Sequence, residues 1–155
     1  MIEYTVPEET FRMIMPQKHP MLLIDGIVEC SPENKTGICG LTVGRRNTAA
    51  LDEDGCLSSF CLIEIMAQTM AAVSSYSAYS TGRQKMQKGL LMTVRDCRLL
   101  CGSSIKPGTE ILIRSVPVYD EADIIRSSVR AWIPSSDEVI SEALITACQT
   151  VAGTD

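Results

Sequence analysis

The segment at residues 60–73 is apolar around nearly its whole circumference when it is read as a helix. Apart from one cysteine, its only ionisable side chain is Glu64. A helix that is apolar on all sides has to be enclosed by the rest of its fold, because no face suits water. We therefore expect other elements to wrap this helix, with Ser58 or Ser59 capping its start and Gly82 ending it.

After Gly82 the apolar pattern changes from a helical period to strict alternation, which is typical of strands. Four strands are predicted, at residues 89–98, 110–118, 125–133 and 139–151. Short turn-forming segments separate these strands, so that consecutive strands are expected to pair antiparallel.

Two further strands are predicted before the helix, at residues 21–30 and 35–43, after a short helix at 10–15. A tight connection is expected at 119–121. A strongly curved antiparallel sheet around one buried helix satisfies both periodicities. The chain is therefore predicted to be an α+β protein of the hot-dog type, with a single domain over residues 1–155.

The composition excludes several classes of partner. The net charge of −5 argues against nucleic acid and against anionic membranes, and aromatic residues make up only 5% of the chain. Glu64 and Gln68 interrupt the longest apolar run, so that no membrane span of about 18 residues is predicted. The amino terminus does not resemble a signal peptide. A cytosolic protein is expected.

The seven cysteines are scattered without a Cys-x-x-Cys pair, and the chain has only one histidine. Cys97 and Cys101 are four residues apart, but a single histidine does not complete an ordinary zinc set. Reduced, buried thiols in a cytosolic protein are therefore predicted, with no metal and no cofactor.

Three segments of the chain resemble one known family. They are Met-Pro-Gln-Lys-His-Pro-Met-Leu-Leu-Ile-Asp at residues 15–25, Leu-Ile-Glu-Ile-Met-Ala-Gln at 62–68, and Gly-Leu-Leu at 89–91 leading to Ile-Lys-Pro-Gly at 105–108. In this order they resemble the hot-dog β-hydroxyacyl-acyl-carrier-protein dehydratases, particularly the divergent thioester dehydratases of polyene and pigment pathways.

One departure from this family concerns the catalytic histidine. Typical members carry it in a Gly-His-Phe-Pro-Gly segment before the acidic residue, whereas residues 47–56 here contain no histidine. Divergent relatives carry a histidine in the first motif, at the position of Gln17. The only histidine of this chain is His19, two residues later.

Dehydration of a 3-hydroxyacyl thioester requires a base at C2, an acid at the departing hydroxyl and donors for the enolate. The resemblance implies that Glu64 is the acid, and burial is expected to raise its pKa toward neutrality. Otherwise Glu64 is a structural carboxylate. Gln68, one helical turn later, either orients Glu64 or the hydroxyl, or anchors a neighbouring strand.

His19 is the candidate base, because imidazole titrates near neutrality; the alternative is an exposed loop histidine. Gln17 is able to hydrogen-bond substrate but not to act as a base. Enolate stabilisation is expected from free N–H groups at the start of the helix, near Gly55, Cys56, Leu57 and Ser58. Cys56 is expected to be an inert thiol rather than a nucleophile, as is Cys61.

A basic cluster of Arg83, Lys85 and Lys88 follows the end of the helix. It either complements the helix dipole or, with Arg45 and Arg46, docks an acidic acyl carrier protein.

The sequence thus predicts reversible dehydration of an acyl thioester, linked to carrier protein or CoA, by a homodimer. The resemblance places the site between subunits whose sheets join edge to edge. Two alternatives remain: a hot-dog thioesterase that uses Glu64 to activate water, and a non-catalytic subunit that binds acyl thioesters.

Overall fold

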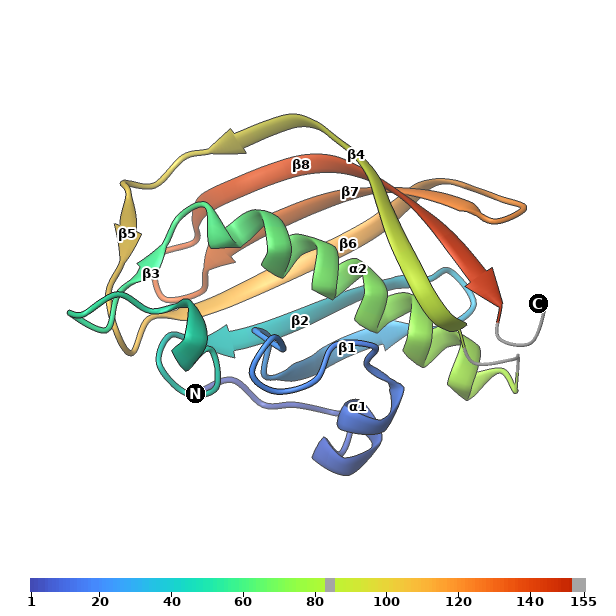
Figure 1. Ribbon diagram of the computed structural model, residues 1–155, viewed down its shortest axis with the longest axis horizontal. Coiled ribbons are helices and arrows are strands. Elements are labelled where there is room, and N and C mark those ends of the chain that lie inside the picture. Colours follow the sequence, from blue (N-terminus) through green and yellow to red (C-terminus); the bar gives the residue numbers. More distant parts are fainter. Residues whose placement is uncertain (83–85, 152–155) are drawn as a thin grey trace.

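A six-stranded antiparallel sheet dominates the computed structural model, which describes residues 1–82 and 86–151 (Figure 1). Its strand order is β1-β2-β6-β7-β8-β4. The strands are β1 (Gly26–Ser31), β2 (Thr36–Thr42), β4 (Met86–Leu99), β6 (Glu110–Glu121), β7 (Ile124–Ile133) and β8 (Glu138–Val151). The two strands predicted before the helix and the four predicted after it are confirmed.

The helix α2 (Cys61–Ser80) lies against one face of this sheet, which curves around it (Figure 1). Leu62, Ile65 and Met66 on α2 are fully buried in one cluster with the inward side chains of the sheet. The enclosed central helix and the hot-dog architecture predicted from the sequence are therefore confirmed.

The helix approaches the sheet closely at Gly37 of β2. A Cβ atom at this position would lie 2.8 Å from the Cγ2 atom of Val73 on α2 and 2.8 Å from the backbone oxygen of Glu29. Such distances are far below van der Waals contact, so only glycine permits this approach of α2 to the sheet.

The start of α2 differs from the prediction. Its N-cap is Phe60, without a side-chain capping bond, because Leu57 and Ser58 form a short strand, β3 (Leu57–Ser58), instead. This strand pairs with β5 (Ser104–Ile105) in a separate two-stranded sheet that the sequence did not predict. Gly82 does follow the helix end, with a φ of 69° that glycine adopts readily.

Two other boundaries also differ. The strand predicted from residue 21 begins only at Gly26, because residues 18–22 form a turn in which the backbone oxygen of Lys18 accepts two bonds. The connection predicted at 119–121 is wrong, since these residues still pair with β7. The chain turns next at Ala122, where φ is 56°.

The first helix, α1 (Glu8–Ile14), begins two residues before its predicted start and packs on α2. A 3-10 turn, η1 (Thr48–Ala50), follows β2. In the described part of the chain, no helix is long and apolar enough to cross a membrane.

Candidate functional site

A cavity of about 460 Å³ opens beside α2. Its walls come from α2, from Pro16 and Gln17, and from strands β4 and β8. Glu64 is the only acidic or basic side chain among the described residues that line it, and Ala67, Met70 and Leu91 supply much of the apolar wall. The predicted acid thus faces a cavity that is large enough for part of an acyl chain.

Within one chain the side chain of Glu64 is exposed, so the prediction that the fold buries it is wrong. Met66, two residues later and on the opposite side of α2, is fully buried against the sheet. Glu64 instead lies on the side of α2 that the cavity leaves open to solvent. Within residues 1–82 and 86–151 nothing buries this carboxylate.

Gln68 contacts Glu64, as one prediction had it, but its backbone partners belong to the loop before β1 and not to a neighbouring strand. Its Nε2 donates to Oε1 of Glu64 at 3.0 Å and to the backbone oxygen of Met21 at 2.8 Å. Its Oε1 accepts a bond of 2.8 Å from the backbone N–H of Leu23. Gln68 is fully buried, so that it fixes one oxygen of Glu64 to the segment that precedes β1.

Gln17 lines the same cavity as Glu64. Its Oε1 is buried and has no hydrogen-bond partner among the described residues. A buried amide oxygen is normally satisfied by protein or water, and none of the described residues supplies a donor to this one. The position where divergent relatives carry histidine is thus at the site, but here it holds an amide.

His19 does not line this cavity. It is exposed and belongs to a second cavity, with Arg12, Lys18 and Arg45. Within one chain the structure therefore does not bring His19 and Glu64 into a common site. The turn at residues 18–22 carries the side chain of His19 away from the side on which Gln17 lies.

The candidate enolate donors are also placed elsewhere. The backbone N–H groups of Gly55 and Cys56 bond to oxygens of Asp52, at 3.0 and 2.9 Å. Leu57 and Ser58 belong to β3, and none of the four residues lines the cavity of Glu64. These groups are not free donors at a helix start, because α2 begins only after them.

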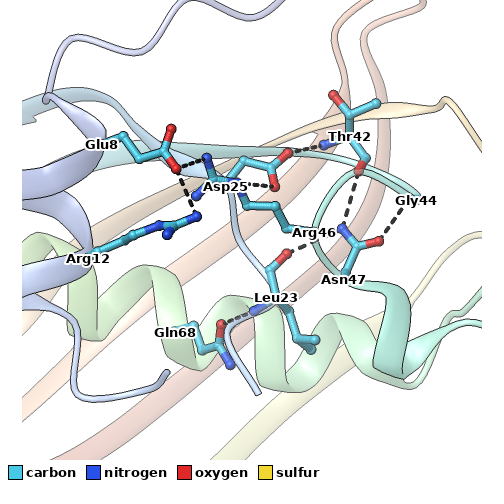
Figure 2. A network of polar contacts seen from close by, with 9 residues as sticks. All are labelled: Glu8, Arg12, Leu23, Asp25, Thr42, Gly44, Arg46, Asn47 and Gln68. Carbon is cyan, nitrogen blue, oxygen red and sulfur yellow. Dashed lines mark hydrogen bonds and ion pairs between the residues drawn. The ribbon is translucent and has the colours of Figure 1, made fainter. Parts of the chain in front are cut away.

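A polar network supports the segment that Gln68 holds (Figure 2). Asn47 is fully buried, and its Nδ2 donates to the backbone oxygens of Leu23 and Thr42, at 3.3 and 3.2 Å. Its Oδ1 accepts from the N–H of Gly44 at 2.8 Å. Asn47 was not predicted from the sequence, although an asparagine three residues after a glycine is typical of loops in which such side chains bond the backbone.

Asp25 lies at the other end of this network (Figure 2). Its Oδ2 accepts a bond of 2.8 Å from the N–H of Thr42, and its Oδ1 lies 4.0 Å from Nε of Arg46. Desolvation raises the pKa of Asp25 above its ordinary value, against the opposing effects of the Thr42 bond, Arg45 and Arg46. The acidic residue that ends the first motif is thus a structural carboxylate that holds the loop after β2.

The basic cluster and the cysteines add no group to the cavity of Glu64 among the described residues. Arg83 and Lys85 lie outside the described residues, as does the side chain of Lys88. All seven cysteines are free, but only Cys39 is buried, so the prediction of buried thiols is wrong for the other six. Burial, followed by the charge of Glu64, raises the pKa of the Cys61 thiol. A raised pKa disfavours the thiolate, which argues against a nucleophilic role. Within the described residues no group of acidic, histidine and cysteine side chains is arranged to hold a metal.

Comparison with known families decides which kind of hot-dog protein this is. A family model described as ApeP-like, ApeP dehydratase, matches residues 9–153. The chain belongs to the ApeP-like dehydratase family. A curated relative, the 3-hydroxyacyl-[acyl-carrier-protein] dehydratase FabZ of Bartonella bacilliformis, is 27% identical over 136 residues, which cover 86% of this chain and 84% of the relative. Thioester dehydration is therefore the activity that the comparisons support.

Solved structures agree on the fold of this ApeP-like chain. The dehydratase heterocomplex ApeI:P of Xenorhabdus doucetiae superposes with a TM-score of 0.82 at 19% identity, over 95% of this chain and 93% of the other. Mouse (Mus musculus) thioesterase superfamily member 2 gives a TM-score of 0.63 at 14% identity, over 91% and 92%. At these identities both similarities concern the fold alone.

Proposed function

We propose that this ApeP-like chain dehydrates a 3-hydroxyacyl thioester to the 2-enoyl thioester as one half of a pair of hot-dog subunits. The observation that carries the proposal is the cavity beside α2, where Glu64 is the only ionisable group of the described walls. An acyl chain would lie along Ala67, Met70 and Leu91, with its 3-hydroxyl at Glu64.

Glu64 would protonate the departing hydroxyl. Gln68 holds Oε1 of Glu64 by donating to it, which leaves Oε2 for the substrate. The amide of Gln17 would position the thioester or the hydroxyl, because an amide offers both donor and acceptor atoms. The protein groups of this step need no metal and no redox cofactor, because the reaction only moves protons and expels water.

The base at C2 would come from a second subunit. Among the described walls of the cavity no histidine is present, and Glu64 cannot serve at once as the protonated acid and the base. In a homodimer, the exposed His19 of the neighbouring subunit is the candidate. The second subunit would also cover Glu64 and desolvate it.

Strand β4 is the proposed junction between the subunits. It is the last strand of the sheet order, so that its outer edge is unpaired within the described chain. Leu90, Leu91 and Met92 on β4 are 61%, 50% and 54% exposed, and Leu91 also lines the cavity of Glu64. An exposed apolar edge strand is an aggregation hazard unless another strand or subunit covers it.

Mixing of single variants tests this arrangement. Glu64→Gln and His19→Gln chains are purified separately, each is expected to be inactive, and they are then mixed under conditions that exchange subunits. Recovery of partial dehydration would support a site shared between two copies. Two inactive variants that recover nothing after verified exchange would contradict the role of His19 in the neighbouring subunit.

A heteromeric pair is the second arrangement, supported by the name of the ApeI:P heterocomplex and by the amide at Gln17. In that case a different hot-dog chain brings the histidine, and this chain alone binds thioester without turning it over. The free cysteines are compatible with the reducing cytoplasm, which we propose as the compartment.

A further inference from the structure

Leu23 is held by two buried side chains that come from different parts of the fold. Its N–H donates to Oε1 of Gln68 on α2 at 2.8 Å. Its backbone oxygen accepts a bond of 3.3 Å from Nδ2 of Asn47, in the loop after β2 (Figure 2). Gln68 and Asn47 are both fully buried, so that water does not compete for these two bonds. The backbone of Leu23 is therefore fixed from both sides.

The backbone around Leu23 in turn determines the direction of the Gln68 amide. Oε1 of Gln68 faces the N–H of Leu23, and its Nε2 donates to the backbone oxygen of Met21 at 2.8 Å. A reversed amide would place donor against donor at Leu23 and acceptor against acceptor at Met21. Only the observed direction satisfies both backbone groups, and in this direction Nε2 also faces Glu64.

The direction of this amide decides which oxygen of Glu64 is suited to carry a proton. Nε2 of Gln68 donates to Oε1 of Glu64 at 3.0 Å. An N–H donor stabilises the unprotonated oxygen of a carboxyl group, so that a proton on this group is carried by Oε2. In the proposed dehydration, Oε2 is the atom that gives its proton to the departing hydroxyl. A reversed amide would turn its own oxygen toward Oε1 and draw the proton there.

We propose that Asn47 is a positioning residue for Glu64 and acts on it through Leu23 and Gln68. Asn47 is not among the residues that line the cavity of Glu64, so that it does not touch a substrate bound there. Hydrogen bonds in series inside a protein reinforce one another, and the loss of one bond weakens the next. Without Asn47, the segment before β1 loses a bond that fixes it, and the Gln68 amide follows the displaced backbone away from the carboxylate. The effect on catalysis rests on the proposed dehydration, whereas the hydrogen bonds themselves do not depend on it.

A purely local role of Asn47 is the competing explanation. Its Nδ2 also donates to the backbone oxygen of Thr42 at 3.2 Å, and its Oδ1 accepts from the N–H of Gly44 at 2.8 Å. These two bonds hold the loop after β2 itself and do not reach α2. A change at Asn47 that only loosens this loop would lower stability without altering the Gln68 amide.

Two variants and one control separate these roles. Asn47→Ala removes the donor to Leu23, whereas Asn47→Ser keeps a shorter donor, a hydroxyl, and carries both measurements if the alanine variant does not fold. Ile113→Val is the control. Ile113 is fully buried on β6 and does not line the cavity of Glu64, so that this change weakens the core without touching the hydrogen bonds of Leu23 and Gln68.

The side-chain amide of Gln68 gives the first readout, by proton–nitrogen NMR of the protein without substrate. In both Asn47 variants we expect the Nε2 signals of Gln68 to shift toward those of an exposed glutamine, because their acceptors move away. In Ile113→Val we expect these signals at their wild-type positions. Signals that stay in place in a folded Asn47 variant, or that move as far in Ile113→Val, overturn the proposal.

The turnover number gives the second readout, with any copurifying hot-dog partner present. We expect Asn47→Ala to lower kcat about tenfold to hundredfold, with KM within about twofold of the wild type, because a misplaced acid affects the transition state rather than binding. Asn47→Ser should lose less, and Ile113→Val should keep the wild-type kcat. An unchanged kcat in Asn47→Ala, where the wild type dehydrates, overturns the positioning role. A wild type that dehydrates no thioester contradicts the proposed function alone, since the Gln68 signals still decide whether Asn47 positions Glu64.

Discussion

Gln68 donates a hydrogen bond of 3.0 Å from Nε2 to Oε1 of Glu64, one turn away on α2. The same amide also holds the backbone of Met21 and Leu23. The orientation of the proposed acid is thus tied to the segment that carries Gln17 and His19. Motion of that segment would be transmitted to the carboxylate through one buried side chain.

Gln68→Met is therefore expected to destabilise the protein. Methionine fills a similar volume but leaves the N–H of Leu23 and the backbone oxygen of Met21 unsatisfied in the interior. We expect a loss of about 2–4 kcal/mol in the free energy of unfolding, measured by urea denaturation. Gln149→Met, which removes an amide from the same cavity, should cost less than about 1 kcal/mol. Equal losses of unfolding free energy in the two variants would show that the hydrogen bonds of Gln68 do not stabilise the segment before β1.

The stability of the protein should depend on pH through Asp25. Burial raises its pKa above the ordinary 3.8, so that the folded state binds a proton more readily than the unfolded state. The stabilisation from that proton is fully present below pH 3.8 and is lost as pH rises through the raised pKa.

Asp25→Asn removes this titration, and comparison with the wild type isolates it. The unfolding free energies of both proteins are measured at about pH 4 and about pH 7. We expect the unfolding free energy of the wild type to fall, relative to that of Asp25→Asn, as the pH rises from about 4 to about 7. An opposite change would mean that the nearby Arg45 and Arg46 outweigh the desolvation of the carboxylate.

The elements and the site differ in how far the sequence predicted them. The all-round apolarity of residues 60–73 required a central helix, and alternation located six strands. Turn positions were predicted less well. The polar residues at 119–121 resemble a turn, yet they remain paired because β6 and β7 extend together past the core. Polarity alone does not distinguish a turn from the exposed end of a hairpin.

The structure places Gln17 and Glu64 on one cavity, with Gln68 bonded to Glu64, but Glu64 is exposed and not buried as predicted. His19 and the predicted enolate donors lie elsewhere. An apolar helix shows that something covers it, and does not show whether the cover belongs to the same chain. Asn47 was missed because its role depends on the approach of Leu23, which is far from it in sequence.

In the heteromeric arrangement, where this chain receives no histidine from a second copy, Gln17→His should increase dehydration by the chain alone. The substitution places an imidazole in the cavity of Glu64, where the described walls hold no other base. General base catalysis is worth about 10²–10⁴-fold, so that a gain of at least tenfold is expected, with a rate that rises through the imidazole pKa near 6.5. Gln149→His, elsewhere on the cavity wall, serves as the positional control. If neither variant dehydrates faster, the lack of a base in this cavity does not limit the dehydration rate.

Charges on β4 should separate the subunits. Leu90→Asp and Met92→Asp place a carboxylate on the exposed apolar edge and are expected to give monomers in analytical ultracentrifugation. Val118→Asp, at a position on β6 that is 58% exposed, should leave the assembly of the wild type intact. If all three variants associate alike, β4 is not the junction.

The central claim is that Glu64 dehydrates an acyl thioester, and mass spectrometry of the reaction products tests it most directly. Purified protein, with and without the Glu64→Gln change, is incubated with a 3-hydroxyacyl thioester, alone and together with any copurifying hot-dog partner. We predict loss of one water with the thioester intact, abolished in the variant. Hydrolysis to the free acid, or dehydration that persists in Glu64→Gln, would contradict the account.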